Sequence, residues 1–237
     1  MRLQKFFSDS GVLSRRAAEA EIAAGKVTVN GKIAVIGDSV DPETDVVEYK
    51  GKRILPRIDQ PRHYIMLNKP RGYVTTAKDE KGRRTVTDLT HGVGVRVYPV
   101  GRLDMDSDGL LLLTDDGDFA NRLTHPRHEI PKIYHVTLAS PPTVEQIAAL
   151  KAPMTLDGYM LQPVKIRCLD QLTLEMQLYE GRNRQIRRMC EAVGARITRL
   201  RRVAIGDLTL GELPVGKWRH LTAQEVAYLN LHNKEGK

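Results

Sequence analysis

The sequence predicts an α+β fold in two parts: a small N-terminal domain with a helix pair, and a larger domain built on a mixed, largely antiparallel sheet with flanking helices. Three observations support this prediction. Strand-like segments outnumber helical ones in the larger part, they do not alternate with helices as parallel βαβ units would, and a proline-containing segment at residues 54–61 separates the two parts. We therefore expect domains at residues 1–60 and 61–237.

The N-terminal part is expected to fold as two short helices followed by a β-hairpin. Apolar residues at helical spacing between positions 3 and 7 predict the first helix. Ser14 is a good N-cap for a second helix that extends up to Gly25. Residues 26–31 predict a strand that enters an Asn-Gly turn, and residues 33–40 predict the returning strand.

The larger part contains the remaining strands and helices. Strands are expected at residues 64–67, 96–101, 110–114, 133–138 and 171–180, and helices at residues 143–151, 183–193 and 222–231. The strand at 171–180 has the clearest pattern, because leucine and methionine alternate there with polar residues. The last helix opens with Thr222 and Glu225 in the spacing of a capping box.

The composition indicates a basic protein with a polyanionic partner. The chain has 237 residues, 41% of them hydrophobic, and a net charge of +8, which favours a nucleic acid or an acidic membrane surface as partner. Its longest leucine run, residues 110–113, is far too short to span a membrane. Two cysteines without a spacing motif suit a reducing compartment, so we expect a cytoplasmic protein.

The segment GRLDMDSDGLLLLT at residues 101–114 contains the first candidate catalytic residue. Asp104 follows one predicted strand and precedes another, and a carboxylate at a strand end beside an arginine can act as a nucleophile or as an acid/base. Two alternatives remain open for this segment alone. It could be an acidic turn between strands, or a calcium-binding loop.

The calcium alternative depends on spacing. Asp104, Asp106, Asp108, Gly109 and Asp115 occupy positions one, three, five, six and twelve of such a loop. The closing residue is Asp instead of Glu, however, and the flanks are predicted strands, which disfavours calcium. His125 and His128 lack further ligands that would complete a zinc site, so we expect no metal.

Arginines are concentrated after residue 180. The segment EGRNRQIRRMCEAVG at residues 180–194 predicts a helix with one apolar face. Eight arginines lie between residues 182 and 202, namely Arg182, Arg184, Arg187, Arg188, Arg196, Arg199, Arg201 and Arg202. Guanidinium groups match phosphate oxygens in geometry, so this density predicts phosphate binding.

Residues 14–31, SRRAAEAEIAAGKVTVNG, resemble the αL-type RNA-binding module known from small-subunit ribosomal protein four. In such a module two short helices present arginine and lysine to phosphates, which positions a protein on RNA without reading its sequence. The expected phosphate contacts are Arg2, Lys5, Arg15, Arg16 and Lys26. An ordinary solvated basic helix is the alternative.

Five segments together resemble the bacterial ribosomal pseudouridine synthases that carry this module. They are LNKPRGYV at 67–74, GRLDMDSDGLLLLT at 101–114, PKIYHVTL at 131–138, EGRNRQIRRMC at 180–190 and GELPVGKWRHLT at 211–222. The resemblance implies that Asp104 is the nucleophile, that Tyr134 stacks on the target base and that Arg187 pairs with the Asp104 carboxylate. The isomerisation is redox-neutral, so no cofactor is expected.

The resemblance also predicts the partner. Lys69, Arg71, Arg102, Lys132, Arg182, Arg184 and Arg188 are expected to contact RNA phosphates or to frame the cleft. The partner would be ribosomal RNA or a subunit assembly intermediate, bound by a monomer. Residues 118–126 and 216–222 favour the large-subunit RNA over the small-subunit RNA. A catalytically silent RNA-binding assembly factor is the alternative function.

Overall fold

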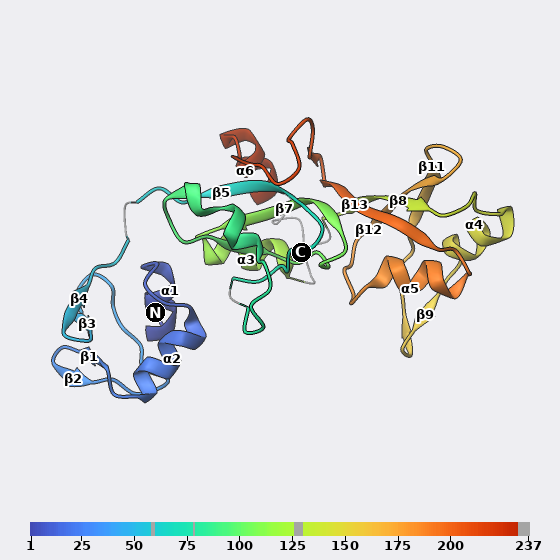
Figure 1. Ribbon diagram of the computed structural model, residues 1–237. Helices are drawn as coiled ribbons and strands as arrows, with labels where there is room; N and C mark the ends of the chain where they lie inside the picture. Colours follow the sequence, from blue (N-terminus) through green and yellow to red (C-terminus); the bar gives the residue numbers. More distant parts are fainter. Residues whose placement is uncertain (58–59, 78, 126–129, 232–237) are drawn as a thin grey trace. The chain divides into compact units, whose positions relative to one another are not determined.

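Figure 1 shows the computed structural model, which describes residues 1–57, 60–77, 79–125 and 130–231. The chain divides into two compact units. The first comprises Met1–His63 with the short segments Gly94–Arg96 and Asp115–Gly117, and the second comprises Tyr64–Val93, Val97–Thr114 and Asp118–Lys237. Within the described residues, no helix has the length and apolar character needed to cross a membrane.

The N-terminal unit packs two helices on a four-stranded antiparallel sheet of order β2-β1-β3-β4. Its elements are α1 (Leu3–Asp9), α2 (Arg15–Ala23), β1 (Val27–Val29), β2 (Lys32–Ile33), β3 (Val47–Tyr49) and β4 (Lys52–Ile54). Leu3, Phe6 and Phe7 are buried in its core, as their helical spacing predicts. Ser14 caps α2 by accepting a hydrogen bond from the backbone N–H of Ala17.

The hairpin is confirmed, but its second strand is shorter than expected. Asn30 and Gly31 have φ values of 50° and 77°, which a tight turn of this kind requires. The returning strand β2 ends at Ile33, so the expectation of a strand through residue 40 is wrong. The chain turns there because the Asp38 carboxylate accepts a hydrogen bond from the N–H of Val35, and β3 takes the other edge of β1.

The larger unit contains a nine-stranded sheet whose main path is β11-β12-β8-β13-β7-β5-β15. Its strands are β5 (Tyr64–Lys69), β6 (Tyr98–Val100), β7 (Asp108–Thr114), β8 (Lys132–Leu138), β11 (Lys165–Cys168), β12 (Thr173–Leu178), β13 (Ile197–Ile205), β14 (Leu208–Thr209) and β15 (Trp218–His220). The pairing of β13 with β7 is parallel, whereas the other pairings are antiparallel. The predicted mixed, largely antiparallel sheet is confirmed.

Helices and a small hairpin flank this sheet. They are the 3₁₀ turns η1 (Val86–Leu89) and η2 (His91–Val93), α3 (Gly117–Thr124), α4 (Val144–Lys151), the hairpin β9–β10 (Thr155–Leu156 and Tyr159–Met160), α5 (Gln185–Ala192) and α6 (Ala223–Leu231). The predicted capping box of α6 is present, since Thr222 and Glu225 exchange side-chain to backbone hydrogen bonds. The sequence patterns missed α3, both 3₁₀ turns and the strands β9, β10, β11, β13, β14 and β15 of this unit.

Two cores lie on the sheet, and their junction places the loop before β7. One packs α5 against β8 and β12, and the other packs α3 and α6 against β7 (Figure 1). The halves meet where β13 runs parallel to β7. Gly109 has a φ of 109°, and a Cβ there would collide with the backbone of Arg202, so the close strand approach requires glycine. Residues 104–108 therefore lie beside the second half of the sheet.

Candidate active site

A cavity of about 240 Å³ lies between the loop after residue 101, strand β8 and the segment that leads into α5. Its lining includes Asp104, Ser107, Tyr134 and Arg184. The two motifs that the sequence singled out are 80 residues apart, and the parallel β13–β7 contact brings them to one cavity. A cavity of this size suits one unstacked nucleotide better than a duplex.

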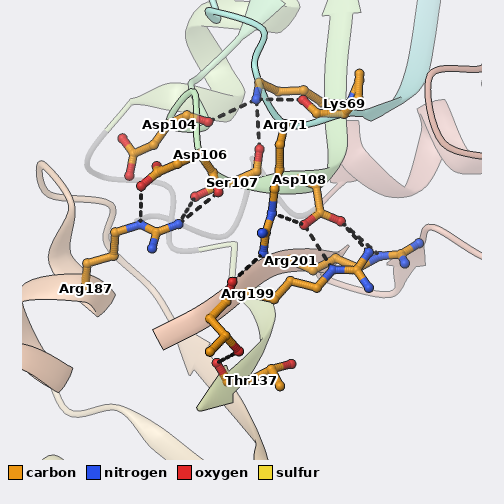
Figure 2. Close-up of polar contacts among 12 residues, drawn as sticks. Lys69, Arg71, Asp104, Asp106, Ser107, Asp108, Thr137, Arg187, Arg199 and Arg201 are labelled. Atoms are coloured by element: carbon orange, nitrogen blue, oxygen red, sulfur yellow. Dashed lines mark hydrogen bonds and ion pairs between the residues drawn. The ribbon is translucent and has the colours of Figure 1, made fainter. Parts of the chain in front are cut away.

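Lys69, at the end of β5, holds the Asp104 loop from beneath. Its amine donates to the carbonyl oxygens of Pro70, Asp104 and Ser107 at 3.1, 3.0 and 2.8 Å (Figure 2). The residue is completely buried, and this burial lowers its pKa to about 8. Of the two roles expected for Lys69, contact with RNA phosphate or framing of the cleft, the structure favours the second, because its three donors are directed to backbone carbonyls, two of them in the loop.

Arg187, on α5, contacts the same loop from the other side. It donates to the carbonyl oxygen of Asp106 at 3.0 Å and to the hydroxyl of Ser107 at 3.2 Å, and its Nε lies 3.3 Å from the Asp106 carboxylate (Figure 2). Its side chain is 17% exposed, and burial lowers its pKa. The expected pairing of Arg187 with the Asp104 carboxylate is corrected, because the carboxylate of Asp106 takes that place.

Arg184 is the arginine within ion-pair distance of the candidate nucleophile. Its guanidinium forms a bidentate pair with Asp106 at 3.1 and 3.0 Å and lies 3.7 Å from an oxygen of Asp104. The backbone of Arg184 has φ 49° and ψ 31°, a left-handed conformation that is uncommon outside glycine and that clusters at functional sites. This conformation begins α5 and directs the side chain of Arg184 to the loop.

The Asp106 carboxyl is kept ionised by these two arginines. Its partial burial alone would raise its pKa, but the hydrogen bond from Arg184 and the charge of Arg187 lower that pKa below its usual value. The loop thus presents two carboxylates, Asp104 and Asp106, to two guanidinium groups.

Tyr134 lies in the middle of β8, where the register pairs it with Met176 of β12 and Arg202 of β13. Its ring packs against the core beneath α5 and also lines the cavity. An aromatic ring in this position offers a flat apolar surface to a base.

The other predicted RNA contacts of this unit separate into two groups. Arg102 and Arg182 line the cavity with Arg184. Arg182 also stacks on the ring of Tyr159, with 3.1 Å between its guanidinium carbon and the ring centroid. The second group, Arg71, Arg188 and Lys132, does not line that cavity. Arg71 donates a hydrogen bond to the Thr198 carbonyl, and Arg188 pairs with Asp157 at 2.6 Å. Burial lowers the pKa of Lys132 to about 8.

The five predicted contacts of the N-terminal unit lie on or next to its helices. Arg15 and Arg16 are exposed at the start of α2. Lys5 pairs with Asp9, Lys26 pairs with Glu21, and Arg2 bonds to the carbonyl of Gly37. Arg2 and Lys26 are exposed as well, whereas Lys5 is half-buried.

Two residues that line the cavity, Ser107 and Glu180, were not predicted from the sequence. Ser107 accepts the hydrogen bond from Arg187, whereas Glu180 accepts hydrogen bonds from the N–H of Gln162 and the side chain of Gln185, both at 3.0 Å. A signal for Glu180 existed, since it ends the strand with the clearest alternation and begins the arginine-rich segment.

The geometry disfavours the calcium-binding alternative, because the acidic side chains face arginines in different directions. Asp106 forms an ion pair with Arg184. Figure 2 shows that Asp106 also faces Arg187, whereas Asp108 bonds to Arg199 of β13, at 2.8 Å. Among the residues that the structure describes, no group of three histidine, cysteine or acidic side chains could hold a metal ion.

A second cavity, of about 620 Å³, is larger but lacks the candidate catalytic residues. It is lined by Ile133, His135 and Thr137 of β8 and by Arg199 and Arg201 of β13. These alternate along the strands with Tyr134 and Leu200, so this cavity lies on the opposite face of the sheet.

Comparisons with known proteins agree with both sequence resemblances. The family described as "RNA pseudouridylate synthase" matches residues 63–192, and the family described as "S4 domain" matches residues 1–46. The chain is 40% identical over 243 residues to "Ribosomal large subunit pseudouridine synthase B" of Bacillus subtilis, covering 100% of this chain and 98% of that protein. It is also 40% identical over 226 residues to "Dual-specificity RNA pseudouridine synthase RluF" of Escherichia coli, covering 95% of this chain and 77% of that protein.

A solved structure supports the same relationship. The protein described as "Crystal structure of pseudouridylate synthase" superimposes with a TM-score of 0.69 and 34% identity, over 97% of this chain and 99% of that one.

Proposed function

Because the chain belongs to the RNA pseudouridine synthase family, we propose that it isomerises one uridine of ribosomal RNA, with Asp104 as the nucleophile. The predicted family and the predicted enzyme class, an RNA pseudouridine synthase, are confirmed. The observation that carries the proposed role of Asp104 is its position: its carboxylate lines the small cavity, with Arg184 at 3.7 Å and Tyr134 in the same lining.

The reaction breaks the bond between uracil N1 and ribose C1′, turns the base and joins C1′ to C5. Asp104 would either attack C1′ or remove a proton from the ribose, and both routes need its carboxylate ionised. Arg184 lies 3.7 Å from one oxygen of that carboxylate, within ion-pair distance. The target base must leave its stack to enter the cavity, and the Tyr134 ring would then receive it.

Lys69 and Arg187 both hold the loop that carries Asp104 in position. Between them they bond to four atoms of the loop, the carbonyls of 104, 106 and 107 and the hydroxyl of Ser107. A loop fixed in this way keeps the carboxylate in the cavity before substrate arrives, which is the preorganisation that fast chemistry needs.

The large-subunit RNA is the proposed target. The Bacillus subtilis relative is named for the large ribosomal subunit, and the chain covers 98% of it. We propose residues 1–60 as the RNA-binding domain and residues 61–237 as the catalytic domain. This division agrees with the first unit's main segment, Met1–His63. The enzyme would act as a monomer in the cytoplasm, on free ribosomal RNA or on an assembly intermediate.

Pseudouridine mapping across both ribosomal RNAs tests this proposal. A strain that lacks the gene is compared with the same strain carrying the wild type or Asp104→Asn. We expect one large-subunit site to disappear and to return with the wild type alone. A small-subunit site would correct the target, and restoration by Asp104→Asn would show that another residue is the nucleophile.

A further inference from the structure

Asp106 lies where an anion of the substrate would be expected. Its carboxylate accepts hydrogen bonds from both terminal guanidinium nitrogens of Arg184, at 3.1 and 3.0 Å, and lies 3.3 Å from Nε of Arg187. Arg184 also lines the cavity and lies 3.7 Å from Asp104. The two-oxygen face of a carboxylate and that of a phosphate present the same fork to a guanidinium group. A phosphate could therefore take the place of Asp106 without any movement of the arginines.

The charges explain why an acidic residue is needed there at all. The side chain of Arg187 is only 17% exposed, and a largely buried cation without an anion is costly. In the absence of RNA, Asp106 supplies that anion. Its own side chain is 46% exposed, and a pair that reaches solvent contributes little net stability, so a competing anion can displace it readily.

The location indicates which phosphate would compete. Asp106 does not line the cavity itself but lies beside it, next to the loop that carries Asp104. When the target ribose reaches Asp104, the phosphates attached to that ribose must lie at the rim of the cavity. Arg184, which touches both carboxylates, would then bind one of them.

We propose that Asp106 occupies a phosphate subsite formed by Arg184 and Arg187 in the RNA-free protein, and that a phosphate flanking the target uridine displaces it. This inference rests on the proposed function, because it places the target ribose at Asp104. The Asp106 carboxylate then acts as an internal competitor of RNA, and it keeps both arginines in position until the substrate arrives.

The test is the affinity of the full chain for a ten-residue oligouridylate, measured by fluorescence anisotropy between about 50 and 200 mM salt. An RNA phosphate that binds the arginines releases a cation into solution. In the wild type the displaced Asp106 carboxylate attracts a cation from solution, so the net release of cations is smaller. Asp106→Asn cannot do so. We expect the variant to bind about threefold to tenfold more tightly at the lowest salt, with a slope of log K against log salt steeper by about 0.7.

Asp157→Asn is the matched control, because it makes the same change in net charge. Asp157 pairs with Arg188, which lies on α5 as Arg187 does. The Asp157 side chain is 77% exposed and does not line the cavity. We expect its affinity to stay within about twofold of the wild type. Equal tightening in both variants would reduce the effect to net charge and overturn the proposal, as would unchanged or weaker binding by Asp106→Asn.

Conversion of uridine in transcribed large-subunit RNA is measured on the wild type in parallel. If the wild type modifies this RNA but Asp106→Asn shows no tightening, the subsite is wrong and the proposed function stands. If Asp106→Asn tightens binding but the wild type modifies no uridine, the exchange at the arginines stands and the proposed function fails.

Discussion

Asp106 and Asp108 are two residues apart, and each is surrounded by arginines, yet they differ in nearly every other respect. The Asp106 side chain is 46% exposed and contacts two arginines from the segment 184–187. The Asp108 side chain is 5% exposed and contacts Arg71, Arg199 and Arg201 at 3.5, 2.8 and 3.9 Å (Figure 2). Asp108 begins β7, and its partners belong to the turn after β5 and to β13.

The difference shows that similar ion pairs can serve different purposes. The contacts of Asp108 connect the two halves of the sheet, and no RNA phosphate can replace a carboxylate that is almost fully enclosed. The contacts of Asp106 lie beside the cavity and reach solvent, so they can be exchanged. Arg71, which the sequence analysis predicted to contact RNA or frame the cleft, belongs to the structural cluster, since its partners are Asp108 and the Thr198 carbonyl.

The largest effect is expected at a third carboxylate on the same loop. Asp104→Asn removes the proposed nucleophile but keeps its shape, so pseudouridine formation should fall on the order of 10⁴-fold. Neither Asp106→Asn nor Asp108→Asn should approach this loss in the folded protein. The rate is measured in single turnover on transcribed ribosomal RNA, and an unchanged melting temperature serves as the control. A loss of less than tenfold would move the nucleophile elsewhere.

Stability should separate Asp108 from Asp106 directly. Asp108→Asn leaves three arginines beside a neutral group, but two of them are nearly half exposed, so we expect a loss of about 2 kcal/mol in the free energy of unfolding. Asp106→Asn should cost less, about 1 kcal/mol, because Arg184 is 44% exposed and Arg187 keeps its hydrogen bonds to the Asp106 carbonyl and the Ser107 hydroxyl. Urea denaturation followed by Trp218, the one tryptophan of the chain, measures both. Equal losses would contradict the division between a structural and an exchangeable pair.

Tyr134 tests the apolar side of the same cavity. Tyr134→Ala removes the proposed stacking surface and should reduce kcat/KM about tenfold to 100-fold, as loss of base stacking does. Tyr134→Phe keeps the ring and should remain within about threefold of the wild type. If both variants lose activity equally, the hydroxyl matters more than the stacking surface.

The smallest effect concerns the pH dependence that Lys69 imposes. Its pKa of about 8 lies below 10.5, so the unfolded chain binds more protons between these values and the Lys69 contribution to the free energy of unfolding rises with pH. Activity should move in the opposite direction. Above pH 8 the neutral amine has two N–H donors for three carbonyl acceptors, two of which belong to the loop, and kcat should fall about threefold by pH 9.

An arginine substitution identifies the group responsible for this pH dependence. Lys69→Arg stays charged at alkaline pH, so it should abolish the fall above pH 8, whatever its activity at pH 7. Lys132→Arg is the matched control, because burial also lowers the pKa of Lys132 to about 8 but this residue lies on β8 and not beneath the loop. If the fall of kcat above pH 8 persists in Lys69→Arg but disappears in Lys132→Arg, the titrating group is Lys132.

The sequence by itself determined the two-part organisation, most elements, the enzyme family and the candidate residues of the site. Local patterns were sufficient where they report local physics: Ser14 caps a helix, Asn30 and Gly31 make a turn, and residues 173–178 alternate between core and solvent. Family motifs were equally sufficient for the enzyme class, because they identify Asp104 and the arginine-rich segment without coordinates.

Only the tertiary structure decided which arginine or lysine lies beside which carboxylate. The segment 184–187 and the loop 104–108 are distant in sequence, so no local pattern could reveal that Arg184 reaches Asp104 or that Arg187 contacts Asp106. Lys69 looks like a surface lysine in a proline-glycine turn, but β5 ends in the interior and buries its amine. Burial and ion pairing arise when distant strands pack together. For this reason the sequence could predict the charged residues here, and the fold alone decided which of them remain free to contact RNA.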